Sequence, residues 1–331
     1  MKFFLLFSLP VLYALSFFAK QVPQTDFTSV NPTATELWDL KDIKFATGLV
    51  DWRNRPIDSL HLDIYYPPGA SSDKKYPMIL FCHAGGFEGG KKENVMAICD
   101  RFADEGFVAV ALDYRVGYNK GDLNNCVSDT AGRNAAIYRA TQDANSCLRF
   151  LSAHADEYNI DTSKFFLGGS SAGGDLSLTT AYVNDSIASI RFAEPYKRLG
   201  GVSSTGNTLT NKFQIKGIVC MWGAMYNDKW IDTNYRSYPT IIFKGTDDDG
   251  LPDSMGYFHS CPNYEILFAG VGIYARLRNQ NTPSVFYLLS NAPHPAYDDK
   301  FCVQQSACFL RAVMAKRAYS GSYTGYPSSC Q

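Results

Sequence analysis

One glycine-rich stretch, residues 168–175, constrains the fold of this chain more than any other. It reads GGSSAGGD and lies between residues 164–167, which predict a buried strand, and residues 176–181, which predict a helix. A strand that turns sharply into a helix brings two backbone segments close together, and glycines permit this approach because they carry no Cβ. Within the stretch, residues 169–173 match G-x-S-x-G, a turn that exposes its central residue, here Ser171, at the tip.

The remaining chain alternates between predicted strands and helices, which indicates a mostly parallel sheet with helices on both faces. Residues 44–52 and 60–64 alternate polar and apolar, as an antiparallel hairpin with one solvated face does. We therefore expect an α/β fold with a central sheet of about eight strands and an antiparallel N-terminal hairpin. The predicted parallel strands are 78–82, 107–112, 164–167, 217–222, 240–243 and 284–289, and the predicted helices are 95–106, 135–153, 176–181, 264–278 and 296–318.

Two stretches interrupt this alternation. Residues 119–130 form a polar loop, and residues 185–213 are rich in Ser, Thr, Gly and Asn toward their end. Both are candidates for a lid or rim of a substrate site, with plain surface loops as the alternative. A chain of 331 residues is long enough for two domains, but large α/β sheets often form one, and we expect a single domain over residues 20–331.

The N-terminus predicts a targeting segment. Lys2 precedes an apolar run over residues 3–18, which is short for a membrane span and typical of the core of a signal peptide. We expect residues 1–19 to be a signal peptide cleaved after Ser16 or Ala19, and the mature protein to be secreted or periplasmic. An uncleaved anchor is the alternative. Beyond this segment, no stretch of the sequence predicts stable membrane insertion.

Charge and cysteine content narrow the possible partners. The net charge is -1 with no long basic or acidic run, so we expect no binding of nucleic acid through its phosphates. Export favours disulfides, and the odd number of nine cysteines leaves at least one thiol unpaired within the chain. Cysteine and histidine lack zinc-site spacing, so no metal site is expected. Cysteines expected to pack inside are Cys82, Cys99 and Cys220, and the candidates for disulfides are Cys126, Cys147, Cys261, Cys302, Cys308 and Cys330.

A serine hydroxyl becomes a good nucleophile when a base lies within hydrogen-bond reach and a carboxylate orients that base. His294 follows the last predicted strand, at the sheet edge where ligand-facing residues gather. Three adjacent aspartates, Asp247, Asp248 and Asp249, follow the preceding strand, and their spacing leaves open which one faces His294. The order Ser, Asp, His is that of α/β-hydrolases. The alternatives are a polar loop histidine and a solvated turn or weak cation site.

A second glycine-containing loop, HAGGF at residues 83–87, follows predicted strand 78–82. Backbone N–H groups in such a loop stabilise a developing oxyanion, and each is worth about 3 kcal/mol. We expect His83 to fix this loop rather than act as a base. The predicted N–H donors of the oxyanion hole are Gly85, Gly86 and Ala172. The candidates for the apolar rim of the substrate pocket are Phe87, Met221, Trp222 and Met225, with core packing as an equal alternative for Met221.

At these motifs the chain resembles the carboxylesterases of the hormone-sensitive-lipase-like and feruloyl-esterase-like branches of the α/β-hydrolases. The likeness covers about residues 44–316 and departs from the family pattern at Ala84, where the family has glycine, and at Ser170, where it has an acidic residue. The resemblance implies that Ser171 is the nucleophile, Asp248 the acid and His294 the base, and it implies neither a metal nor an organic cofactor. The motifs that carry it are HAGGF at 83–87, DYR at 113–115, GSSAGGDL at 169–176 and GTDD at 245–248.

These observations predict an exported serine esterase that cleaves a small-molecule or polymeric carboxylic ester through an acyl-enzyme. The alternatives are a serine peptidase of the same fold and a non-catalytic binding protein that retains the fold. The sequence suggests neither a propeller nor an amine-binding carboxylate pair, which argues against the peptidase, and the four retained motifs argue against the binding protein. The acyl group, the alcohol and the oligomeric state are not specified by the sequence.

Overall fold

The computed structural model describes residues 35–122 and 125–330. The predicted signal peptide and both of its cleavage positions lie outside these ranges. Within them, no helix is both long and apolar enough to cross a membrane.

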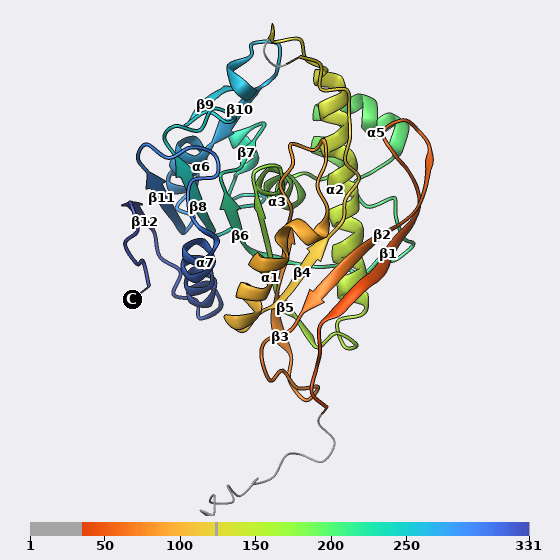
Figure 1. Ribbon diagram of the computed structural model, residues 1–331, viewed down its shortest axis with the longest axis vertical. Helices are drawn as coiled ribbons and strands as arrows, with labels where there is room; N and C mark the ends of the chain where they lie inside the picture. Colours follow the sequence, from red (N-terminus) through yellow and green to blue (C-terminus); the bar gives the residue numbers. More distant parts are fainter. Residues whose placement is uncertain (1–34, 123–124, 331) are drawn as a thin grey trace, which may run out of the picture. The chain divides into compact units, whose positions relative to one another are not determined.

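A nine-stranded sheet forms the centre of the described chain (Figure 1), with the strand order β1-β2-β4-β3-β5-β6-β8-β11-β12. The first two strands form the predicted antiparallel hairpin, β2 pairs antiparallel with β4, and all other neighbours are parallel. The predicted α/β fold is confirmed, with one edge strand, β12, that the sequence did not predict. The strands are β1 (Leu40–Val50), β2 (Pro56–Tyr65), β3 (Tyr76–Cys82), β4 (Val108–Leu112), β5 (Ile160–Ser170), β6 (Ile215–Met221), β8 (Thr240–Gly245), β11 (Ser284–Leu289) and β12 (Gly321–Thr324).

Helices cover both faces of the sheet because its inner strands are apolar on both sides. In β3, Met78 and Leu80 point into one buried cluster and Ile79 and Phe81 into another. The first cluster takes its helical residues chiefly from α2 (Thr130–Ala153), α3 (Ala172–Tyr182) and α6 (Gly270–Asn279), and the second takes them from α1 (Met96–Asp104) and α7 (Asp299–Met314). The two faces are visible in Figure 1.

Residues 264–278, predicted as one helix, are instead a strand followed by a helix. Strand β10 (Ile266–Ala269) pairs with β7 (Ala224–Met225) and β9 (Met255–Tyr257) in a small antiparallel sheet, and α6 starts only after it. Short apolar runs fit both periodicities. Here the strand forms because it pairs with two distant segments. Its side chains alternate as in a strand, with Leu267 buried and Ile266 exposed.

The first half of the predicted loop 185–213 is helical. It contains α4 (Asp185–Arg191) and α5 (Ala193–Leu199), and only residues 200–214 remain irregular. The side chain of Asn184 caps α4 by accepting a hydrogen bond from the backbone N–H of Ile187 at 2.9 Å. An asparagine directly before a helix start is a typical N-cap, so the sequence carries a signal for α4.

Two disulfides form among the described residues, Cys126–Cys261 and Cys308–Cys330. The expectation that Cys147 and Cys302 form disulfides is wrong. Both side chains are fully buried, Cys147 on the inner face of α2 and Cys302 in the first turn of α7, and both thiols are free. Burial in the two apolar clusters makes them packing residues, as predicted for Cys82, Cys99 and Cys220.

Candidate active site

Four loops meet at one edge of the sheet. Strands β3, β5, β8 and β11 are parallel, so their carboxyl ends lie at the same edge. The loop with Gly85 follows β3, Ser171 follows β5, Asp248 follows β8 and His294 follows β11. The topology therefore brings together groups that are spread along the sequence from residue 85 to residue 294.

Three of the predicted residues form a continuous hydrogen-bonded chain. The hydroxyl Oγ of Ser171 lies 2.7 Å from Nε2 of His294, and Nδ1 of His294 lies 2.9 Å from Oδ2 of Asp248. Of the three adjacent aspartates, Asp248 is the one whose side chain is buried, whereas Asp247 and Asp249 are exposed. This arrangement suits proton transfer from the serine to the imidazole, with the carboxylate orienting the ring.

The backbone at Ser171 is strained in a way that the surrounding glycines permit. Its φ is 53° and its ψ is −122°, an unusual conformation for a residue with a side chain, and it sits directly before the first residue of α3. A Cβ on Gly169 would overlap the backbone carbonyl of Gly173, and a Cβ on Gly173 would overlap the carbonyl of Cys82. The turn can therefore close only with glycine at both positions, which is the physical reason for the G-x-S-x-G pattern.

Both carboxylate oxygens of Asp248 accept hydrogen bonds. Its Oδ1 accepts hydrogen bonds from the backbone N–H groups of Gly250 and Leu251 at 3.0 and 2.9 Å. Its Oδ2 accepts from His294 and also lies 2.6 Å from Nζ of Lys244, whose side chain is fully buried. Burial alone would raise the pKa of Asp248, but the bonds to His294 and Lys244 outweigh it and hold this pKa well below its usual range.

Sequence reasoning missed Lys244. The signal was present, because Lys244 follows the apolar run 240–243 without interruption and precedes Asp248 by four residues. A lysine inside a buried strand requires a partner that offsets its desolvation, and three aspartates, Asp248 among them, follow Lys244 within five residues.

The loop after β3 is held in place by His83. This side chain is fully buried, its ring stacks on that of Tyr114 with centroids 4.0 Å apart, and its Nδ1 lies 2.7 Å from the carbonyl oxygen of Ala84. Burial lowers the pKa of His83 to about 4. Gly85 and Gly86 follow with φ values of 122° and 62°, which favour glycine. His83 therefore has the surroundings of a scaffold residue.

A cavity of about 670 Å³ opens above the Ser171 hydroxyl. Trp222 is part of its wall and meets the His294 ring edge to face, with centroids 6.4 Å apart. Among the other residues that line it are Ala84, Gly85, Gly86, Ala172, Lys120, Arg133, Phe258 and His259. The predicted oxyanion donors thus border the same space as the Ser171 hydroxyl.

Two of the predicted rim residues do not line this cavity. Phe87 is fully buried and packs against Tyr114, with ring centroids 6.1 Å apart, because the loop turns its side chain inward. Met225 is 1% exposed, since it belongs to β7 and faces the core. For Met221 the sequence left the pocket rim and core packing as alternatives. The structure shows core packing, because Met221 is buried at the end of β6.

A buried ion pair at the cavity wall also escaped sequence reasoning. Arg133 of α2 lies 3.4 Å from Asp175 of α3 and donates a hydrogen bond to the Tyr226 hydroxyl at 2.7 Å. Burial raises the pKa of Asp175 to about 6, although Arg133 and a hydrogen bond from the Ala224 N–H oppose this. Arg133 and Phe258 both line the cavity, and the guanidinium carbon lies 4.4 Å from the centroid of the Phe258 ring.

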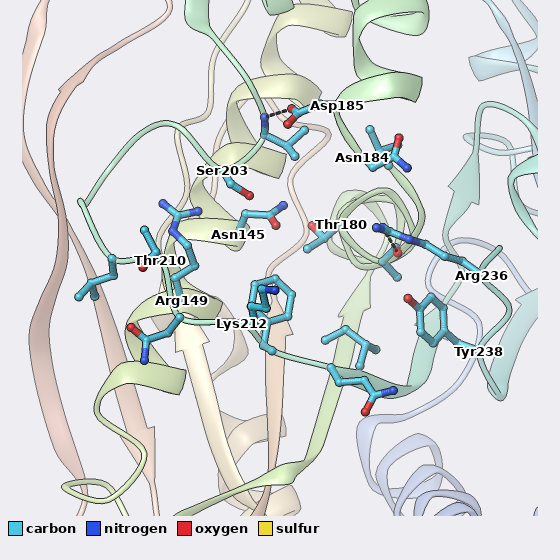
Figure 2. Close-up of a pocket in the computed structure, with 18 residues that line it drawn as sticks. Asn145, Arg149, Thr180, Asn184, Asp185, Ser203, Thr210, Lys212, Arg236 and Tyr238 are labelled. Carbon is cyan, nitrogen blue, oxygen red and sulfur yellow. Dashed lines mark hydrogen bonds between the residues drawn. The ribbon is translucent and has the colours of Figure 1, made fainter.

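The two interrupting loops have different positions. Residues 119–130 contribute Lys120 to the cavity above Ser171 and are tied to residue Cys261 by the Cys126 disulfide. Residues from the 185–213 segment do not line this cavity but line a second one, drawn in Figure 2. In the described residues, no cluster of three or more His, Cys, Asp or Glu side chains has the geometry to hold a metal ion.

Comparisons with known proteins bear on the family and the fold of this chain. The family profile described as BD-FAE matches residues 62–230, about half of the chain. Gut esterase 1 of Caenorhabditis briggsae is 28% identical over 118 residues, which are 35% of this chain and 20% of that protein. The non-reducing polyketide synthase pkbA of Emericella nidulans is 28% identical over 157 residues, 47% of this chain and 6% of that protein. The chain thus spans a fifth or less of the length of these relatives.

Solved structures of similar fold include esterases. Thermogutta terrifontis esterase 2 phosphonylated by cyclosarin has a TM-score of 0.58 and 19% identity, over 88% of this chain and 97% of that one. A truncated carbohydrate esterase from gut microbiota has a TM-score of 0.57 and 15% identity, over 85% and 98%. At these identities the likeness concerns the fold. Together with the family match, it shows that this chain belongs to the BD-FAE family and has the α/β-hydrolase fold.

Proposed function

We propose that this protein is a serine carboxylesterase in which Ser171 is the nucleophile, His294 the general base and acid, and Asp248 the carboxylate that orients the imidazole. The observation that carries the proposal is the unbroken hydrogen-bonded chain from the Ser171 hydroxyl through His294 to Asp248. The strained turn that presents the serine and the cavity above it support the same assignment.

In the proposed reaction, Oγ of Ser171 attacks the ester carbonyl carbon while Nε2 of His294 takes the hydroxyl proton. The carbonyl oxygen becomes an oxyanion, which the backbone N–H groups of Gly85, Gly86 and Ala172 stabilise. The intermediate collapses, the C–O bond to the alcohol breaks, and the imidazolium gives its proton to the leaving oxygen. Water, deprotonated by His294, then cleaves the acyl-enzyme and frees Ser171.

Several findings support ester hydrolysis rather than another reaction of this fold. The relatives named above include a gut esterase, a carbohydrate esterase and a thermophilic esterase solved with butyrate bound. The acyl-enzyme proposed here is a serine adduct, and the phosphonylated Thermogutta structure is a covalent derivative of the same kind of fold. The substrate is therefore a carboxylic ester, small enough or flexible enough to reach the Ser171 hydroxyl through the cavity.

The proposal includes export. Residues 1–19 have the composition of a signal peptide, and the two disulfides are typical of proteins from an oxidising compartment. Mass spectrometry of the mature N-terminus should find cleavage after Ser16 or Ala19, and a protein that retains residue 1 would contradict export by this route.

Hydrolysis of p-nitrophenyl acetate and p-nitrophenyl butyrate by wild type and Ser171→Ala tests the proposal. We expect kcat to fall by at least about 10³-fold in Ser171→Ala, because the residual rate comes from the oxyanion hole and binding alone. Ser189→Ala, on the exposed surface of α4, is the matched control and should keep full activity. Equal activity of folded wild type and Ser171→Ala would refute the assignment. A series of acyl chain lengths would then define the acyl group that the cavity accepts.

A further inference from the structure

The second cavity has a volume of about 550 Å³ and shares no lining residue with the active site. It lies between α2, the last turn of α3 and the irregular segment that leads into β6 (Figure 2). The residues that matter for its chemistry are Asn145, Arg149, Thr180, Asp185, Lys212 and Arg236.

Its floor contains polar groups that lack partners. Arg149 is 4% exposed, and one of its nitrogens, Nη2, donates to the carbonyl oxygen of Thr205 at 2.8 Å. Its Nε and Nη1 have no hydrogen-bond partner among the described residues, where no other side chain has two such buried atoms. The hydroxyl of Thr180, 5% exposed, is also without a partner there. Figure 2 shows Arg149 with Ser203 and Asn145 among the side chains that line the cavity.

The charge of Arg149 is also uncompensated. Two other buried arginines have a carboxylate partner, since Arg115 lies 2.8 Å from Asp143 and Arg133 lies 3.4 Å from Asp175. In the part of the chain that the structure describes, no carboxylate lies within 4.0 Å of Arg149, and burial lowers the pKa of its guanidinium without any charge opposing it. A buried cation without a counter-charge is costly, and a bound anion relieves that cost.

The rim adds two more cations. Lys212 is exposed, and Arg236 is half-buried with Nη1 donating to the carbonyl oxygen of Ala181 at 3.2 Å. Asp185 is the one acidic residue in the described lining, and its Oδ1 is already engaged with the backbone N–H of Val202 at 2.8 Å. Three cationic side chains thus face one carboxylate, which favours an anionic ligand.

We propose that this cavity is a binding site for an oxyanion, with Arg149 and Thr180 contacting it from the floor and Lys212 and Arg236 from the rim. The ligand is a free phosphate or a carboxylate carried by a small molecule such as an acidic sugar, because guanidinium and hydroxyl donors bind both kinds of oxygen. The cavity is larger than a single ion requires, so it has room for the remainder of a small ligand. This inference does not depend on the proposed esterase activity.

Thermal unfolding and titration calorimetry of the full chain test the site, at ionic strength held constant with sodium chloride. The probes are inorganic phosphate and glucuronate, with glucose as the neutral control. We expect phosphate, glucuronate or both to raise Tm in a saturable way and to give a measurable binding heat, and glucose to do neither. Binding of phosphate or of glucuronate tells whether the site takes a free phosphate or a carboxylate carried by a small molecule. An unchanged Tm with both anions at 20 mM (roughly 100 times a Kd of 0.2 mM) would overturn the proposal.

Substitutions show where the anion binds. Arg149→Met should abolish the anion-dependent rise in Tm, whereas Arg278→Met, an exposed arginine of α6, should leave it unchanged. If Arg149→Met does not fold, Lys212→Met answers the same question, since it removes an exposed rim cation and should weaken binding several-fold. Binding that is equal in wild type and in the folded variants at positions 149 or 212 would place the anion elsewhere and contradict the proposal.

Discussion

Replacement of Lys244 tests the electrostatics of the proposed triad. The Lys244 ammonium and the His294 imidazole bind the same oxygen of Asp248 at 2.6 and 2.9 Å, so their nitrogens are at most about 5.5 Å apart. Two unit charges at that distance repel by about 3 kcal/mol if the effective dielectric constant is about 20. Lys244 therefore opposes formation of the imidazolium. In Lys244→Met this opposition is gone.

The expected result is an upward movement of the acid limb of the kcat/KM profile. The repulsion corresponds to about two pH units, and we expect a movement of at least about one unit in Lys244→Met. Lys244→Arg keeps the charge, so its acid limb should stay near that of wild type whatever its rate. Breaking a fully buried pair costs about 3–5 kcal/mol of folding stability, so profiles are recorded below Tm with circular dichroism as the check on folding. An acid limb that stays within about 0.3 units of wild type in folded Lys244→Met would refute this reasoning.

Three further predictions concern the turn, a disulfide and the acid. Gly173→Ala should abolish the hydrolysis of nitrophenyl esters, because the added Cβ would overlap the Cys82 carbonyl. Gly89→Ala is the control in the same assay and should keep the fold, because the space around Gly89 is open. Cys126→Ser opens a disulfide that spans 135 residues and should lower the unfolding free energy in urea by about 2–5 kcal/mol. Because the pKa of Asp248 is depressed in the folded protein, the ionised carboxylate stabilises the fold above about pH 4, and this stabilisation is lost as the pH falls further. The difference in unfolding free energy between wild type and Asp248→Asn should therefore shrink from pH 5 to pH 2.

The order of strands and loops could be predicted because it follows from local patterns. Continuous apolar runs such as residues 284–289 indicated strands buried on both faces, and parallel pairing then placed the loop residues Ser171 and His294 at one edge. The structure brings these two side chains within 2.7 Å, although 123 residues separate them. A rule of topology, rather than any local signal, connects them.

Orientation within a loop could not be predicted. The sequence offers three consecutive aspartates, and only the backbone path after β8 decides that Asp248 turns inward to His294 and Lys244. Phe87 lies between the oxyanion loop and the core, and the turn directs its ring toward Tyr114 instead of the cavity. Such choices depend on a few backbone dihedral angles and on contacts with distant residues, which periodicity does not report.

Nearness to a loop was a poor guide to disulfides for the same reason. Cys147 was a candidate for a disulfide because it lies nearer a loop in the sequence, yet its side chain lies on the buried face of α2. A disulfide needs two Cα atoms within about 7 Å, as in Cys126–Cys261 at 5.2 Å, and this distance is a property of the tertiary fold.

The most direct test of the central claim is covalent labelling of the nucleophile. The folded protein is incubated with a fluorophosphonate ester, and the site of modification is mapped by mass spectrometry of its peptides. The proposed triad predicts one label per chain, on Ser171, formed much more slowly in His294→Ala and absent from that position in Ser171→Ala. Absence of labelling in folded protein that hydrolyses esters, or a label on a different serine, would contradict it.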